Sequence, residues 1–260
     1  MRFLIILATV AFLILPASAQ AQGREGETNF VVTVKSRDAK FIGTAMGGAQ
    51  VIIRDRRSGD ILVQGRTYGG TGDTKKIMDG DLKRDAILVD ENTAKFQFSM
   101  EIIEPIPVTI SATGPLDQPQ ASTTVSEDTI LIPGKDYTQG NGIMLELPGF
   151  AVDILDPPAN SSAKLDPAKP VPILVNVLKM CGCHIAAGSP WPPERYDVEV
   201  RIYKDDIFVT SAALKYGDKP GTYSHNIKIP QTGTYRLVVT AFDRVTKEAG
   251  MDATSFTLTE

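Results

Sequence analysis

The sequence has few residues of the kinds that most often carry chemistry or crosslinks. Its 260 residues include two cysteines, two histidines and one tryptophan. Two cysteines are too few for a fold held by several disulfides, so packed cores must supply the stability. Two histidines leave little scope for a catalytic triad, the Gly-x-Ser-x-Gly pattern is missing, and no carboxylate pair stands out among 31 acidic residues. The sequence therefore predicts a protein that is not an enzyme.

The chain also lacks an excess of positive charge. Its 27 Lys and Arg residues stand against 31 Asp and Glu, and the charges are dispersed. Without a basic stripe to neutralise phosphates, nucleic acid is not an expected partner. Beyond the N-terminus, no segment approaches the roughly 20 apolar residues of a membrane helix. No membrane span is expected in the mature chain.

The first 19 residues read as a secretory signal peptide. Arg2 precedes an apolar run over 3–15, and the small residues Ala17-Ser18-Ala19 predict cleavage after Ala19, with Ala21 as the alternative site. The run is too short to span a bilayer, and the next residue is Gln20 rather than the cysteine of a lipoprotein. We expect a free, periplasmic or secreted protein.

The remaining sequence is typical of an all-β fold. Short runs rich in Val, Ile, Thr and aromatic residues alternate with Gly, Pro, Asn and Asp, which is the pattern of a β-sandwich, and no long segment has a helical period. Two of the runs, 49–55 and 61–65, predict a hairpin. The expected strands are 29–35, 49–55, 61–65, 95–103, 107–113, 143–147, 173–180, 197–202, 222–229, 234–242 and 254–259.

The composition divides the chain into two parts. The stretch 156–172 is rich in proline, asparagine and serine, as interdomain linkers are. We therefore predict an N-terminal β-sandwich domain over 27–155 and a C-terminal one over 173–260. Within the first domain, the Gly-, Asp- and Lys-rich stretch 68–90 reads as a long surface loop, because it lacks the Gly-Lys-Ser/Thr ending and following helix of a phosphate-binding loop.

The C-terminal part resembles bacterial immunoglobulin-like and fibronectin type III-like modules. Their penultimate strand often reads like Gly233-Thr234-Tyr235-Arg236-Leu237-Val238-Val239-Thr240-Ala241 here, and the resemblance covers roughly the last 90 residues. It implies two tandem immunoglobulin-like sandwiches, the first of which is also similar to transthyretin-like sandwiches. It further implies that the hydroxyl of Tyr235 fixes a corner of the fold. Sandwiches of this class host many functions, so the resemblance predicts no activity.

One cluster carries distinctive chemistry: Met180-Cys181-Gly182-Cys183-His184. Together with His225, it contains every cysteine and histidine of the protein. Thiolate, imidazole and thioether groups are preferred by copper and zinc ions. If 173–180 is the second strand of an immunoglobulin-like sandwich, Cys181 begins the loop at its far end. We expect His225 to face inward near the start of the neighbouring antiparallel strand, close enough to complete the site.

The two cysteines have other possible fates. In an oxidising compartment they can form a local disulfide, which is structural or redox-active, or they can pair between molecules. Covalent haem is not expected, because its signature needs two residues between the cysteines and this chain has one. Trp191, which follows the cluster, reads as a shield for a metal, a recognition surface or a cap on the core.

Two functions are consistent with these features. The leading expectation is an exported, non-enzymatic accessory or carrier protein that binds copper, before zinc, through Met180, Cys181, Cys183, His184 and His225. The alternative is a structural or interaction module, in which exposed edges or loops bind a protein or polysaccharide in the cell envelope or extracellular space and the cysteines form a local disulfide.

Overall fold

The fold is all-β, as the sequence predicts. The computed structural model describes residues 27–78 and 83–260, so the expected signal peptide, residues 1–19, lies outside the described residues. The helical elements within this part of the chain are α1 (Thr74–Met78) and two short 3₁₀ turns, η1 (Thr44–Met46) and η2 (Pro193–Arg195). None of the helices in the described residues is long and apolar enough to cross a membrane.

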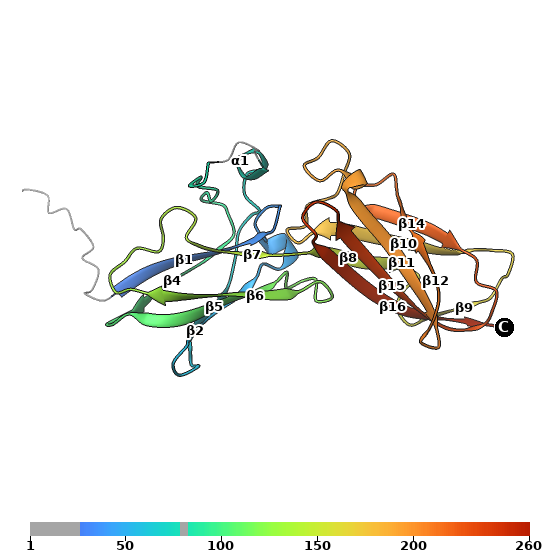
Figure 1. Ribbon diagram of the computed structural model, residues 1–260, viewed down its shortest axis with the longest axis horizontal. Helices are drawn as coiled ribbons and strands as arrows, with labels where there is room; N and C mark the ends of the chain where they lie inside the picture. The colour runs from blue at the N-terminus through green and yellow to red at the C-terminus, as the bar shows by residue number, and fades with distance from the viewer. Residues whose placement is uncertain (1–26, 79–82) are drawn as a thin grey trace, which may run out of the picture.

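Two sheets from the N-terminal half form a first sandwich, drawn in blue to green in Figure 1. Strand β1 pairs antiparallel with β4 and parallel with β7. The expected hairpin is present as β2 and β3. The strands are β1 (Glu27–Ser36), β4 (Lys95–Glu101) and β7 (Ile143–Leu147) in one sheet, and β3 (Ile61–Arg66), β2 (Gln50–Asp55), β5 (Ile106–Gly114) and β6 (Thr123–Leu131) in the other.

Two sheets from the C-terminal half form a second sandwich beside the first. Its four-stranded sheet has the order β13-β14-β10-β8, and its five-stranded sheet has the order β12-β11-β15-β16-β9. The strands are β8 (Phe150–Asp156), β9 (Ser161–Lys164), β10 (Val171–Lys179), β11 (Tyr196–Lys204), β12 (Ile207–Ala213), β13 (Lys215–Tyr216), β14 (Thr222–Ile227), β15 (Gly233–Asp243) and β16 (Ala249–Thr259).

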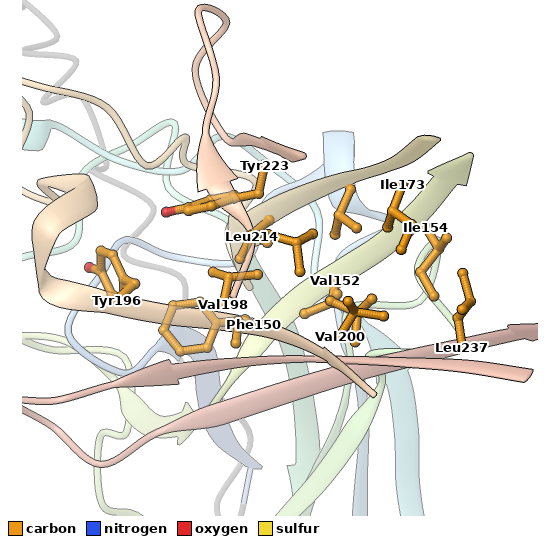
Figure 2. Close-up of a cluster of buried hydrophobic side chains, with 14 of the residues drawn as sticks. Phe150, Val152, Ile154, Ile173, Tyr196, Val198, Val200, Leu214, Tyr223 and Leu237 are labelled. Atoms are coloured by element: carbon orange, nitrogen blue, oxygen red, sulfur yellow. The ribbon is translucent and has the colours of Figure 1, made fainter. Parts of the chain in front are cut away.

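Alternating side chains fill the space between the sheets of each sandwich. In the second, Val198, Val200 and Ile202 of β11 point inward, whereas the residues between them are exposed. They meet Val152 and Ile173 from the facing sheet (Figure 2). The first sandwich has an equivalent core from β1, β2, β5 and β7. This period-two burial explains why the apolar runs predicted most of the strands.

The corner expected at Tyr235 is present. Its hydroxyl donates a hydrogen bond of 2.9 Å to the backbone oxygen of Gln231, four residues earlier. The ring packs in the core beside Phe256, with 5.7 Å between the ring centroids. The phenol therefore holds the chain where it enters β15, which is the structural role that the resemblance implies.

The proline-rich stretch 156–172, which was predicted to be a linker between two domains, contributes residues to the sheets of the second sandwich. Strand β8, assigned to the first domain, pairs with β10 of the second sandwich. Strand β9, within the expected linker, pairs parallel with β16 at the edge of the five-stranded sheet. Prolines are tolerated at sheet edges and turns as well as in linkers, so composition alone did not separate these cases. That each sandwich folds as an independent domain stays a prediction.

The expected long loop over 68–90 contains more structure than its composition indicates. It includes α1, and Ile77 and Leu88 pack on Phe41 in a small third cluster of buried residues. Residues 79–82 of the loop lie outside the described residues. Three apolar side chains thus fold the described part of the loop back onto the first sandwich.

Candidate functional site

The structure separates the residues that were expected to bind a metal. His225 pairs with Ile173, near the start of β10, whereas Cys181 follows the end of that strand. Eight residues of extended chain separate Ile173 from Cys181, roughly 26 Å. The expected convergence is therefore wrong, because even Thr222, the first residue of β14, pairs with Asn176, five residues before Cys181. The described residues include no group of three or more His, Cys, Asp or Glu that could hold a metal ion.

The cluster residues themselves have different surroundings. Cys181 and Cys183 form a disulfide, which was the alternative to metal binding. His184 is exposed, and its backbone forms a bridge to Leu178. Met180 is buried in the core of the first sandwich, although β10 belongs to the second. The cluster thus lies where the two sandwiches contact each other. We call this region of contact the joint.

Residues at the joint pack into each other's cores. Met180 from the second sandwich enters the first core, and Ala39 from the first enters the second core. Gly182 has a φ of +79° and lies so close to Met46 that an added Cβ would be 2.9 Å from the Met46 sulfur. The turn inside the disulfide therefore needs glycine for both its backbone conformation and its packing.

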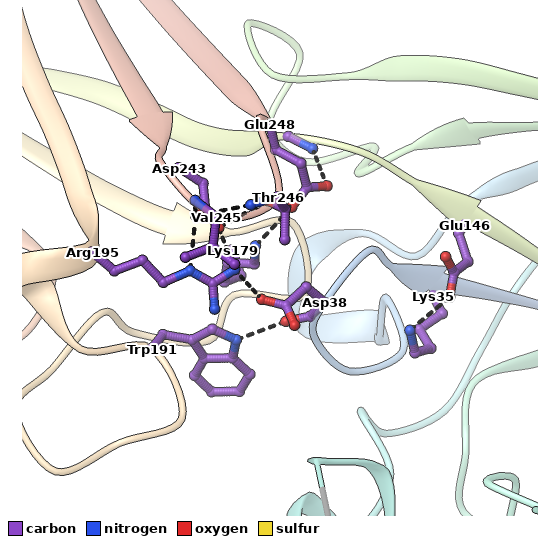
Figure 3. Close-up of polar contacts among 11 residues, drawn as sticks. Lys35, Asp38, Glu146, Lys179, Trp191, Arg195, Asp243, Val245, Thr246 and Glu248 are labelled. Atoms are coloured by element: carbon purple, nitrogen blue, oxygen red, sulfur yellow. Dashed lines mark hydrogen bonds and ion pairs between the residues drawn. The ribbon is translucent and has the colours of Figure 1, made fainter. Parts of the chain in front are cut away.

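Polar contacts also cross the joint, as Figure 3 shows. Arg195 contacts Asp38 of the first sandwich at 2.6 Å and donates from Nε to Asp243 at 2.8 Å. Trp191 is buried in the second core and donates its indole N–H to the backbone oxygen of Asp38 at 2.8 Å. Trp191 therefore caps the core, which is one of its expected roles, and at the same time holds the neighbouring sandwich.

A buried ion pair lies behind these contacts. Lys179 Nζ is 3.1 Å from Glu248 Oε2, and the two side chains are 0% and 1% exposed. The ammonium group also lies over the ring of Phe150, 4.6 Å from its centroid. The Arg195–Asp38 contact joins the two sandwiches, whereas Lys179 and Glu248 both belong to the second sandwich and keep each other paired where it borders the first.

The most exposed apolar segment in the second sandwich is an edge strand. Strand β12 pairs with β11 on one side and ends the five-stranded sheet on the other. Its first three residues, Ile207, Phe208 and Val209, are 73%, 54% and 53% exposed. Val209 is the extra residue of a β-bulge opposite Ile202 and Tyr203. An apolar strand with a free edge can pair with another chain.

The other edges differ from β12 in length or charge. Strand β13 has two residues, and β9 has four and ends in Lys164. Strand β6 contains two adjacent acidic residues, Glu127 and Asp128. Short length and charge are the features that protect a sheet edge from pairing. Strand β12 has no charged residue over its seven positions.

A groove adjoins β12 on the side that faces the second core. Its volume is about 210 Å³, and its walls include Val209 and Thr210 of β12 with Ile227, Ile229 and Tyr235 across from them. Main-chain groups on a free edge and a pocket for alternate side chains are the two parts of a site for strand addition. Our sequence reasoning missed β12, although the run Ile207-Phe208-Val209-Thr210 directly after Asp205 and Asp206 was a signal for it.

Comparisons with known proteins concern the fold. No protein-family profile and no curated protein match the chain. The fibronectin(III)-like modules of Clostridium thermocellum CbhA share 10% identity, with 92% of each chain covered and a TM-score of 0.28. The titin domains z1z2, solved in complex with telethonin, share 12% identity over 90% of this chain and 92% of that one, with a TM-score of 0.27. An engineered protein shares 14% identity over 50% of this chain, which spans 24% of its length, with a TM-score of 0.32.

The sandwich architecture that the resemblance to immunoglobulin-like and fibronectin type III-like modules implies is present in the chain. The pairing of strands in the second sandwich agrees with it, since β8-β10-β14-β13 faces β9-β16-β15-β11-β12 across one core. Such sandwiches serve many purposes, so the function has to be argued from the surface.

Proposed function

We propose that this chain is a non-catalytic interaction module of the periplasm or extracellular space, and that β12 binds a protein partner by strand addition. The observation that carries the proposal is the exposure of Ile207, Phe208 and Val209 on an unpaired sheet edge. Three adjacent apolar side chains in water are unfavourable unless a partner covers them, and the free backbone groups beside them lack hydrogen bonds within the sheet.

The remainder of the fold is suited to this role. The joint connects the two sandwiches through the contacts of Arg195 and Trp191 with Asp38, so the chain presents β12 from a packed support. Rigid presentation lowers the entropy that is lost on binding. A metal-carrier role is not proposed, because His225 lies far along β10 from the disulfide.

The proposal is tested with a charge placed on the edge. The chain beginning at Gln20 is immobilised and used to capture proteins from the envelope and secreted fractions of its source cells, beside a Val209→Lys variant. A matched control, Ile103→Lys, places the same charge on an exposed isoleucine of the first sandwich. A lysine buried at the contact weakens binding by about tenfold or more.

We expect the wild type and Ile103→Lys to retain one common partner protein and Val209→Lys to lose it, while circular dichroism shows that all three are folded. Equal capture of the same proteins by all three chains would contradict the proposed role of β12. A partner lost only from Ile103→Lys would move the binding surface to the first sandwich and also contradict it.

A further inference from the structure

We propose that the Cys181–Cys183 disulfide is a redox-active pair, which takes up two electrons from a dithiol and is attacked at Cys183. This inference does not depend on the edge strand β12, and it adds a chemical function to the interaction module. Three features of the joint support it: the bond contributes little to the fold, the turn around it is held by other contacts, and the two cysteines differ in exposure.

The disulfide closes a very small ring. Only Gly182 separates the two cysteines, whereas the stabilisation that a crosslink gives grows with the length of the segment that it closes. The contacts that connect the sandwiches, such as those of Arg195 and Trp191 with Asp38, do not pass through this bond. Reduction therefore leaves most of the packing in place, and the fold does not require the oxidised state.

The turn that carries the cysteines is held by main-chain hydrogen bonds. The N–H of Gly182 donates to the oxygen of Lys179 at 2.7 Å, and the N–H of Lys179 donates to the oxygen of Cys183 at 3.0 Å. Met180, inside the turn, is anchored in the core of the first sandwich. The Cα atoms of the two cysteines lie 5.4 Å apart, within the usual range for a disulfide. Because these contacts do not involve the sulfur atoms, the reduced thiols stay close enough to be reoxidised within the chain.

The two cysteines differ in their access to solvent. Cys181 is 3% exposed and belongs to the core of the second sandwich, whereas Cys183 is half-buried and packs against that core. His184, the next residue, is exposed, so the chain reaches the surface at this point. A thiolate from solution therefore meets Cys183 first, and access is one of the factors that decide which sulfur is attacked.

The exchange proceeds in two balanced steps. A thiolate of the dithiol attacks Cys183 Sγ, which forms a mixed disulfide, breaks the Cys181–Cys183 bond and releases Cys181 as a thiolate that takes up a proton. The second thiol of the reductant loses its proton, attacks the reductant's own sulfur in the mixed disulfide and releases Cys183, which is protonated in turn. The reductant loses two electrons and two protons and becomes a disulfide, and the cysteine pair gains them.

Thiol counting in glutathione mixtures measures the exchange, with two molecules of this thiol in place of the dithiol. The chain beginning at Gln20 is equilibrated without oxygen at several ratios of reduced to oxidised glutathione, up to about 10 mM of the reduced form, and its free thiols are counted by alkylation and mass spectrometry. We expect both thiols to appear together, with circular dichroism unchanged. A disulfide that stays closed in every mixture, or that opens only when urea unfolds the chain, overturns the proposal.

Two single variants identify the attacked sulfur. Cys181→Ala leaves the half-buried thiol, and Cys183→Ala leaves the buried one. We expect Cys181→Ala to form a mixed disulfide with oxidised glutathione at least about tenfold faster than Cys183→Ala, because access and thiolate fraction govern the rate. Circular dichroism checks that both variants are folded. Equal rates, or a faster Cys183→Ala, overturn Cys183 as the point of attack.

The double variant Cys181→Ala/Cys183→Ala separates a redox role from a structural one. We expect its thermal midpoint to stay within about 5 °C of that of the oxidised wild type, since the small ring adds little stability. A larger loss means that the bond serves the fold, and it overturns the proposal. The double variant should still capture the partner of β12, and Val209→Lys should still exchange with glutathione, so each proposal can fail without the other.

Discussion

Lys179 and Glu248 form a charged pair in surroundings where single charges are strongly unfavourable. Both side chains are fully buried, and each has further partners. Glu248 accepts hydrogen bonds from the backbone N–H of Gly149 at 3.2 Å and the hydroxyl of Thr246 at 3.1 Å. A buried pair of this kind adds little net stability, but the loss of one member leaves the other without compensation. The pair therefore selects one packing of the second sandwich at the end that borders the joint.

We predict that Glu248→Gln lowers the free energy of unfolding by about 3–5 kcal/mol, because the Lys179 ammonium group stays buried without a counter-charge. Urea denaturation at neutral pH measures this change. The double variant Lys179→Met/Glu248→Leu should recover most of the loss, since it removes both charges and keeps the volume. Asp166→Asn is the control: its pair with Lys169 is exposed, so the cost is about 0–1 kcal/mol. A Glu248→Gln cost in that same range would contradict the prediction.

The sequence identified which side chains of the cysteine cluster could bind a metal, but not how far apart they lie in the fold. All cysteines and histidines are in the C-terminal half of the sequence. Whether His225 reaches Cys181 depends on which residue of β10 it faces, and that register is set by packing across the whole sheet. The ion pair could not be predicted for the same reason: Lys179 follows an apolar run, and its partner Glu248 is 69 residues away in the sequence.

At the scale of elements, the turn between β15 and β16 depends on one carboxylate. Asp243 accepts backbone hydrogen bonds from Val245 at 2.8 Å and Thr246 at 3.3 Å and also contacts Arg195. Burial raises the pKa of this carboxyl, but the Arg195 guanidinium and the turn N–H groups outweigh burial and lower the pKa to about 2. The hairpin and the joint are thus both coupled to the ionised form of Asp243.

This coupling predicts a pH dependence. The pKa of Asp243 is lower in the folded than in the unfolded chain, so its stabilisation is complete above about pH 4 and is lost as the pH falls through about 2. We expect Asp243→Asn to be less stable than the wild type by about 2 kcal/mol at pH 6 and the difference to shrink toward pH 2. Urea midpoints at a series of pH values measure this. A difference that stays constant over the range would exclude Asp243 as the titrating group.

The strands that were predicted from the sequence and those that were missed differ in how many of their residues are exposed to water. Strands with one buried face, such as β5, β11 and β15, alternate clearly and were predicted within a few residues. Strands β6 and β12 were missed because their residues face water on much of both sides, so no alternation marks them. Strand β8 was missed because the Asp-Pro-Pro sequence after it resembles the start of a linker.

At the scale of the whole molecule, the two sandwiches share core residues. Ala151 lies in β8 and Met180 directly follows β10 in the second sandwich, but both pack in the first core, and Ala39 makes the reverse contact. Composition marks a boundary where prolines gather, whereas the physical boundary lies where few contacts cross. Here a few core residues cross, so the stability of each sandwich depends in part on residues that belong to the other.

We therefore predict that Met180→Ala destabilises the first sandwich more than the second. The truncation leaves a cavity in the first core and costs about 2–5 kcal/mol there, while the second core, from β11 to β16, keeps its side chains. Hydrogen exchange should show faster opening of β1 and β7 than of β11 and β15, and calorimetry should show a wild-type transition that broadens or splits. Met251→Ala, which truncates an exposed methionine of β16, is the matched control and should leave both sandwiches unchanged. Equal loss of protection in β1 and β15 would instead mean that the joint transmits the change fully and that the two cores unfold as one unit.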